Sequence, residues 1–155
     1  MAIHQDQIIA YQILPKNQNV NYEVYLEFLR DYLLPAVKRK RIRTPYILQD
    51  NARPHKHPEI NSFFQRHRWV VLEHPAYNPD LNPCDFNGFH RIKRPNKGIR
   101  FANVNELSSS YDRVINDVNE KKSSLAYLNC QSAGKIWSRM MKTTLSNDDI
   151  IIIKY

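Results

Sequence analysis

Hydrophobic and polar positions alternate in short runs near the N-terminus and then change to helical spacing. Residues 3–14 alternate loosely around a polar turn at residues 5–7, which predicts the end of one strand and most of the next. Apolar residues then recur at helical spacing over residues 22–34. Asn21 is the expected N-cap of this helix, and Pro35 is its expected stop. The chain therefore begins with two strands and a helix.

The rest of the pattern alternates strands with helices. It predicts a strand over residues 44–49, a helix over residues 58–67, a buried strand over residues 69–72, a helix opening at Pro83 with Asn82 as its cap, a helix after a capping box at Asn103, and a last helix over residues 131–142. Residues 150–153 fit either a terminal strand or an apolar tail. This order predicts an α/β sheet that is parallel in part.

Composition narrows the class of protein. A length of 155 residues suits one domain, and 42% apolar content argues against disorder in the bulk of the chain. There is no apolar stretch long enough for a membrane span and no secretory signal at the N-terminus. The formal net charge of +8 is the electrostatic footprint of a nucleic-acid binder, although a soluble basic protein also fits. The cysteines, Cys84 and Cys130, are widely separated, as is usual for buried thiols in a reducing compartment.

Two aspartates occupy positions suited to chemistry. Asp50 follows an apolar strand, where open α/β sheets place their ligands, and Asp85 follows Pro83 in the first turn of a predicted helix. Taken singly, the first is more often a turn residue and the second a helix cap. Together, two converging carboxylates can hold divalent cations such as Mg²⁺, and paired cations stabilise both oxygens of a phosphodiester displacement.

The segments around these aspartates are QDNARPH and HPAYNPDLNPCDF. They resemble the catalytic domain of mariner-type transposases, in the mariner/Tc-like superfamily, which carry D-N-A-x-x-H and then P-x-Y-S-P-D-L-x-P-x-D. The 34 residues between Asp50 and Asp85 are the spacing of the mariner branch. The resemblance extends loosely over nearly the whole chain, and Asn78 replaces the usual serine.

The resemblance implies an α/β fold with an RNase H-like mixed sheet flanked by helices, and residues 1–155 as one partial catalytic domain. It implies metal-dependent DNA cleavage and strand transfer, with Asp50 and Asp85 as catalytic metal ligands for Mg²⁺ or Mn²⁺. Asn51, Arg53 and His55 would form the rim of the site. DNA is then the expected partner and the nucleus the expected location, with homodimer formation left open. Neither a membrane nor a small-molecule substrate is expected.

One departure from the family concerns the first catalytic aspartate, which the family carries on its first, central strand. Only 49 residues precede Asp50, and Asp6 falls in a turn, so it cannot be that residue. We therefore expect a sheet that is incomplete because its first central strand is missing. We also expect a chain that does not cut DNA alone. The alternative is a non-catalytic remnant that binds nucleic acid or another protein.

Two further patterns leave alternatives open. His55, His57 and Cys84 could contribute to a zinc site, but no second cysteine or histidine has the matching spacing. The basic run over residues 38–43 could be a nuclear localisation signal or a contact to the DNA backbone, and a solvated link between helix and strand explains it equally well.

Overall fold

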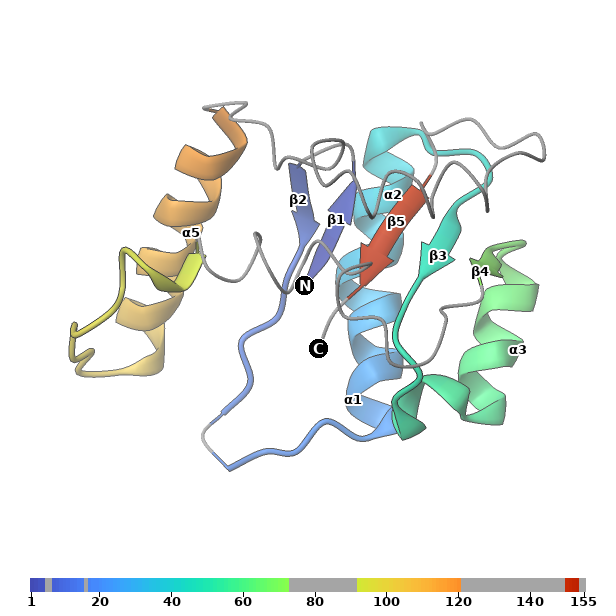
Figure 1. Cartoon of the computed structure of the whole chain (residues 1–155), viewed down its shortest axis with the longest axis horizontal. Helices are drawn as coiled ribbons and strands as arrows, with labels where there is room; N and C mark the ends of the chain where they lie inside the picture. The colour runs from blue at the N-terminus through green and yellow to red at the C-terminus, as the bar shows by residue number, and fades with distance from the viewer. Residues whose placement is uncertain (5–6, 16, 73–91, 121–149, 154–155) are drawn as a thin grey trace, which may run out of the picture. The chain divides into compact units, whose positions relative to one another are not determined.

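The structure is a computed structural model of the 155-residue chain, and it describes residues 1–4, 7–15, 17–72, 92–120 and 150–153 (Figure 1). The chain divides into two compact units. The first comprises Met1–Asn78 together with Ser146–Tyr155, and the second is Pro79–Leu145. The assignment of the chain to a single domain stays a prediction.

A five-stranded sheet forms the first unit. Its strands are β1 (Ala2–His4), β2 (Gln7–Ala10), β3 (Tyr46–Leu48), β4 (Val70–Leu72) and β5 (Ile150–Ile153), in the order β2-β1-β5-β3-β4. Strand β1 is antiparallel to both β2 and β5, whereas β3 is parallel to both β4 and β5. The sheet is therefore mixed, and the predicted α/β class with a partly parallel sheet is confirmed.

Strand β5 occupies the centre of this sheet. Ile152 pairs with Ile3 of β1 on one side and with Leu48 of β3 on the other. We expected a gap at the centre of the sheet, where the first strand would lie. The described sheet has no such gap, because β5 lies between β1 and β3. All four residues of β5 are buried, and β-branched side chains suit a strand that is covered on both faces.

One long helical stretch crosses the unit. It consists of α1 (Tyr22–Glu27), the π-helical segment η1 (Phe28–Leu33) and α2 (Leu34–Lys40). Asn21 caps it as predicted, since its side-chain oxygen accepts a hydrogen bond from the Val24 N–H at 2.9 Å. The predicted stop at Pro35 is wrong. The Leu34 N–H reaches back five residues to the Leu29 carbonyl, and this wider turn accommodates a proline that cannot donate.

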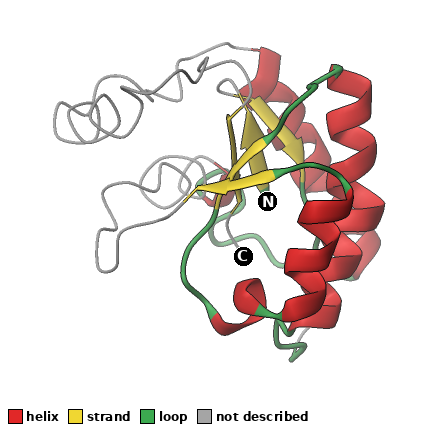
Figure 2. Cartoon of the chain, turned by 90° about the vertical axis from the view of Figure 1, so that its right-hand side faces the viewer, coloured by secondary structure: helices red, strands yellow, loops and turns green. Residues whose placement is uncertain are grey.

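A second helix packs beside the first. The short 3₁₀ segment η2 (Arg53–Lys56) leads into α3 (Pro58–Arg66), which matches its predicted bounds closely. Figure 2 shows the helices of this unit standing against one face of the sheet. The core between them consists of buried residues from both layers, namely Ala2, Ile9, Ala10, Tyr25, Phe28, Leu29, Leu33, Ala36, Val37, Ile47, Ile60, Phe63, Phe64, Trp69, Ile151 and Ile153.

Strand β4 differs from its prediction as a buried strand. Trp69, just before it, is buried against Phe63 and Phe64, as expected of a core residue. Val70 and Val71, however, are 42% and 41% exposed. The strand is last in the sheet order and pairs only with β3 among the described residues, so the apolar run marks an edge strand.

The described part of the second unit contains helix α5 (Val104–Glu120). The predicted capping box is confirmed. The Asn103 side chain accepts from the Glu106 N–H at 2.8 Å, and the Glu106 carboxylate accepts from the Ala102 N–H at 2.7 Å. The helix predicted to open at Pro83 and the one predicted over residues 131–142 lie outside the described residues.

Within the described ranges, every helix is either too short or too polar to span a bilayer.

Candidate functional site

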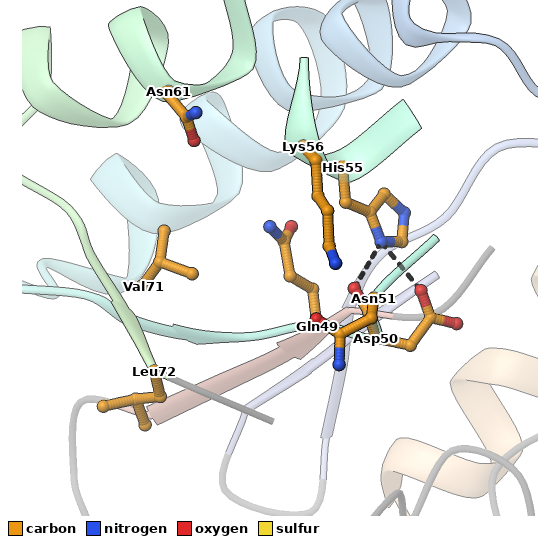
Figure 3. Close-up of a pocket in the computed structure, with 8 residues that line it drawn as sticks. All are labelled: Gln49, Asp50, Asn51, His55, Lys56, Asn61, Val71 and Leu72. Atoms are coloured by element: carbon orange, nitrogen blue, oxygen red, sulfur yellow. Dashed lines mark hydrogen bonds and ion pairs between the residues drawn. The ribbon is translucent and has the colours of Figure 1, made fainter. Parts of the chain in front are cut away.

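A pocket of about 210 Å³ lies where β3 ends (Figure 3). Its lining comes from the end of β3 and the turn after it, from η2 and α3, and from β4: Gln49, Asp50, Asn51, His55, Lys56, Asn61, Val71 and Leu72. Because β3 and β4 are parallel neighbours, their carboxyl ends meet at this edge of the sheet. Ligands of open α/β sheets bind outside such an edge.

Asp50 is held in a defined orientation at the mouth of this pocket. Its Oδ1 accepts a hydrogen bond from the backbone N–H of Ala52 at 3.1 Å, which makes the local turn. The same oxygen lies 2.8 Å from Nδ1 of His55. The carboxylate remains 29% exposed, so it can reach a ligand. Two donors on one oxygen fix the direction in which the group points.

His55 is buried, with only 3% of the residue exposed. Its Nδ1 contacts two oxygens of the same residue, the carbonyl oxygen of Asp50 at 3.0 Å and Oδ1 at 2.8 Å (Figure 3). A carbonyl oxygen can only accept, so Nδ1 must carry the proton that makes these contacts. His55 is therefore a donor that clamps both the backbone and the side chain of Asp50.

Helix α1 supports this clamp from behind. The Tyr25 ring lies 4.4 Å from the His55 ring, and the Tyr25 hydroxyl donates to the side-chain oxygen of Gln49. Tyr25 and Gln49 are both buried. A buried hydroxyl–amide pair fixes the relative position of its two elements, because either group would be costly to leave without a partner. The end of β3 is thus tied to α1.

A second aromatic contact lies beside the first. Tyr22 stacks on His57, with ring centroids 3.6 Å apart and an angle of 13° between the rings. The carboxylate of Glu23, followed by that of Glu59, raises the pKa of Tyr22 above its usual value. The phenol therefore stays neutral at physiological pH. His57 accepts from the Glu59 N–H at 3.4 Å, and it lies outside the pocket as part of the cap of α3.

The structure groups the predicted rim residues differently from the sequence. Asn51 and His55 line the pocket as expected, but Arg53 is exposed on η2 and is absent from the lining. Lys56 takes the place expected of a basic residue, since Figure 3 shows its side chain reaching back toward the segment after β3. The sequence analysis missed Lys56, because Lys56 follows the matched motif. Tyr25 entered it only as one of the positions at helical spacing over residues 22–34.

The fit of a divalent cation can be assessed from the donors. The Asp50 carboxylate is a hard, partly exposed oxygen donor of the kind that Mg²⁺ and Mn²⁺ prefer. Asp85 lies outside the described residues, so its approach to Asp50 stays a prediction. In the described ranges no three His, Cys, Asp or Glu side chains form a metal-sized cluster. The structure gives no support to the alternative of a zinc site, because His55 contacts Asp50 and His57 stacks on Tyr22.

Comparison with known proteins gives two informative sequence relatives. The chain is 33% identical over 91 residues to the Mariner Mos1 transposase of Drosophila mauritiana, a match that covers 55% of this chain and 26% of that protein. It is 26% identical over 113 residues to the human protein named histone-lysine N-methyltransferase SETMAR, covering 70% of this chain and 16% of that protein. The matches thus span only 16% and 26% of the lengths of these two relatives. No protein-family profile matches the chain.

Solved structures agree with these relatives. The Mos1 transposase catalytic domain, determined with raltegravir and Mn, superposes with a TM-score of 0.60 at 26% identity, covering 78% of this chain and 69% of that one. A Mos1 paired-end complex with the left transposon end gives a TM-score of 0.71 at 26% identity, covering 88% of this chain and 40% of that one. The chain is similar in sequence to mariner transposases, and its described fold matches the RNase H-like fold of their catalytic domain.

Proposed function

We propose that this chain is a mariner-type transposase core whose pocket places a DNA phosphodiester beside a divalent cation held at Asp50. The observation that carries the proposal is the clamp on Asp50, in which His55 and the Ala52 N–H both donate to Oδ1. A carboxylate that only ended a strand would not need a buried histidine to orient it. Asp85, at the family's spacing, is proposed as a second ligand.

Each described residue has a role in this proposal. Asp50 ligates the cation, and His55 keeps its carboxylate in one orientation, as outer partners of metal ligands commonly do. Lys56 neutralises the charge of a phosphate entering the pocket, and Asn51 offers an amide to a phosphate oxygen. A bound divalent cation would supply positive charge at the oxygens of the scissile phosphodiester.

The comparisons support the metal and the partner. Structures of the Mos1 catalytic domain contain Mn or Mg, which favours Mn²⁺ or Mg²⁺ as the cation here. Mos1 is also known as a paired-end complex with a transposon end, which favours DNA as the partner and contacts between two copies as part of the assembly. A protein acting on chromosomal DNA in a eukaryotic cell would be nuclear, and we propose that location.

A second function is favoured by strand β5. The family's first strand contributes a catalytic aspartate from the centre of the sheet, and here the central strand consists of four isoleucines without a carboxylate. We propose that this chain binds DNA and metal but does not cleave DNA. This agrees with the alternative of a non-catalytic DNA-binding descendant of a transposase.

The proposal is tested by measuring how a duplex binds with and without Mn²⁺. Fluorescence anisotropy of a labelled DNA duplex should show tighter binding when Mn²⁺ replaces a chelator, because a cation held at Asp50 would supply positive charge to a phosphate of the duplex. Asp50→Ala should remove this increase. Lys56→Gln should weaken binding, whereas Arg53→Gln, which makes the same charge change outside the pocket, should weaken it less.

Two results would contradict the proposal. One is a DNA affinity that is the same with Mn²⁺ and with a chelator. The other is an equal loss of affinity for Lys56→Gln and Arg53→Gln, which would mean that the pocket contributes no more than net charge.

A further inference from the structure

A group of five cations lies at the end of α2, away from the pocket. It consists of exposed residues from the last turn of the helix and the link that follows, and we call it the basic surface: Lys38, Arg39, Lys40, Arg41 and Arg43. No acidic residue interrupts the segment. Without these five residues the formal net charge of the chain would fall from +8 to +3. Most of the excess positive charge is therefore concentrated in one place.

Carboxylates do not neutralise this surface in the described part of the chain. The salt bridges found there join Arg30 to Asp31 and His55 to Asp50. The hydrogen bond described for the surface runs from Lys40 to the neutral side-chain amide of Gln7. A solvated link between helix and strand would be expected to mix charges of both signs, because unbalanced like charges repel one another.

The backbone under the basic surface is held by two hydrogen bonds that close the end of α2. Arg41 takes the left-handed conformation, with φ at 57°, and its N–H bonds to the Lys38 carbonyl. The Ile42 N–H bonds to the Val37 carbonyl at 3.2 Å, and both side chains belong to or pack against the core. This is the Schellman arrangement, in which glycine is the usual residue at the left-handed position. The chain has an arginine there instead, so a cation occupies a position where the backbone favours glycine.

The position of the basic surface separates it from the pocket. Tyr25 lies in α1, at the end of the long helical stretch that contacts His55, and Lys40 lies 15 residues later, where α2 ends. Figure 1 shows α1 and α2 at opposite ends of this stretch. At 1.5 Å per residue the two ends are about 20 Å apart. This equals roughly six base pairs of duplex along the helix axis, so one duplex is long enough to span both.

We infer that the basic surface binds the phosphate backbone of duplex DNA at a point separate from the pocket. This inference depends on the proposed function only because the proposed function names DNA as the polyanion that binds. Lysine and arginine on a rigid helix end suit a rigid array of phosphates, and such contacts position DNA without reading its sequence. A transport receptor that takes an extended basic peptide fits less well, because Lys38, Arg39 and Lys40 would have to leave a helix whose other face is buried.

The test compares two triple variants with the same change in charge. One is Lys38→Gln with Arg39→Gln and Arg43→Gln. The matched control is Arg66→Gln with Lys97→Gln and Arg100→Gln, all of which are exposed and lie elsewhere on the described surface. Affinity for an arbitrary duplex is measured by anisotropy over a range of salt concentrations, with circular dichroism to confirm that each variant is folded.

The basic-surface variant should flatten the dependence of log K on log salt by roughly 2 to 3, since each lost phosphate contact removes about 0.9 from the slope. The control triple should change the slope by less than about 1. Equal effects of the two triples would overturn the inference. So would unchanged DNA binding by the basic-surface variant accompanied by loss of its nuclear accumulation in cells, which would assign the cations to a transport receptor.

If the proposed cation site at Asp50 were wrong, the experiments would give a different result from failure of the basic-surface inference. Asp50→Ala should keep the full salt slope measured in a chelator, because the basic surface acts without the pocket. Loss of the Mn²⁺ effect alone would leave the inference intact. Absence of DNA binding by the unaltered chain at low salt would overturn both.

Discussion

Nδ1 of His55 lies 2.8 Å from Oδ1 of Asp50, and the histidine that makes this contact is almost entirely buried. The contact joins Asp50, in the turn after β3, to the 3₁₀ segment η2 that contains His55, and the Tyr25 ring of α1 lies against the histidine. The carboxylate is therefore oriented before any ligand arrives. Orientation of this kind lowers the entropy that a ligand group loses on binding.

Removing the donor from His55 should weaken metal binding. We expect His55→Ala to lower the affinity for Mn²⁺ by about 10- to 100-fold, the usual range for the outer partner of a metal ligand. Isothermal titration calorimetry with Mn²⁺ measures the change. Rescue comes from His55→Asn, whose side-chain amide can donate from nearly the same position as Nδ1, so part of the affinity should return.

His57 provides the matched control for this prediction. Like His55, it contacts a tyrosine ring, in this case that of Tyr22. Unlike His55, it lies outside the pocket. We expect His57→Ala to leave Mn²⁺ affinity unchanged. If both alanine variants lost affinity equally, or if asparagine at position 55 restored none of it, His55 would have a structural role only.

The buried pair of Tyr25 and Gln49 should contribute to stability. Tyr25→Phe removes the hydroxyl and leaves the buried oxygen of Gln49 without this donor. The free energy of unfolding should fall by about 1–3 kcal/mol, as measured by urea denaturation. Tyr32, which is 41% exposed, gives the comparison, because Tyr32→Phe should change it by less than about 0.5 kcal/mol. Equal values for the two variants would show that the buried bond has no net effect.

Local signals in the sequence predicted much of the fold. Asn21, Pro58 and the box at Asn103 mark helix starts through short-range chemistry, and the structure confirms all three. The prediction that the helix ends at Pro35 was wrong, because the destabilisation that a proline causes depends on the backbone hydrogen bonds around it. The π-helical turn before it could not be inferred from spacing alone.

Long-range pairing explains the larger error. The four isoleucines at residues 150–153 fit a strand, but nothing local indicates which strands they would join. Their place between β1 and β3 depends on the contacts of the whole sheet. The candidate site shows the same difference between local and long-range information. Asp50 and His55 belong to one short motif and were predicted from it. The roles of Lys56 and Tyr25 at the pocket became visible only in the folded chain.

Strand β5 should be essential to the fold. Ile151 is fully buried between β1 and β3, so Ile151→Ala should lower the free energy of unfolding by about 2–5 kcal/mol. If that variant fails to fold, Ile151→Val should still show a loss of about 0.5–1.5 kcal/mol. Val70→Ala, on the exposed edge strand, should cost less than about 1 kcal/mol. An Ile151→Ala chain as stable as the original would place β5 outside the sheet.

This chain should not cleave DNA strands. The central strand β5 consists of four isoleucines and contributes no carboxylate, so paired cations that would stabilise an in-line displacement would lack a ligand from this strand. A supercoiled plasmid incubated with the chain and Mg²⁺ or Mn²⁺ should stay supercoiled on an agarose gel. Nicking that disappears in Asp50→Ala would contradict this prediction and would require a third ligand elsewhere in the chain.

The most direct test of the account is whether Asp50 holds a divalent cation. The measurement is a titration of Mn²⁺ followed by electron paramagnetic resonance, which reports free and bound ion separately, on the unaltered chain and on Asp50→Asn. Asp31→Asn is the control, since that exposed carboxylate pairs with Arg30. The account predicts bound Mn²⁺ that is lost in Asp50→Asn and kept in Asp31→Asn. The same bound fraction in all three proteins would contradict it.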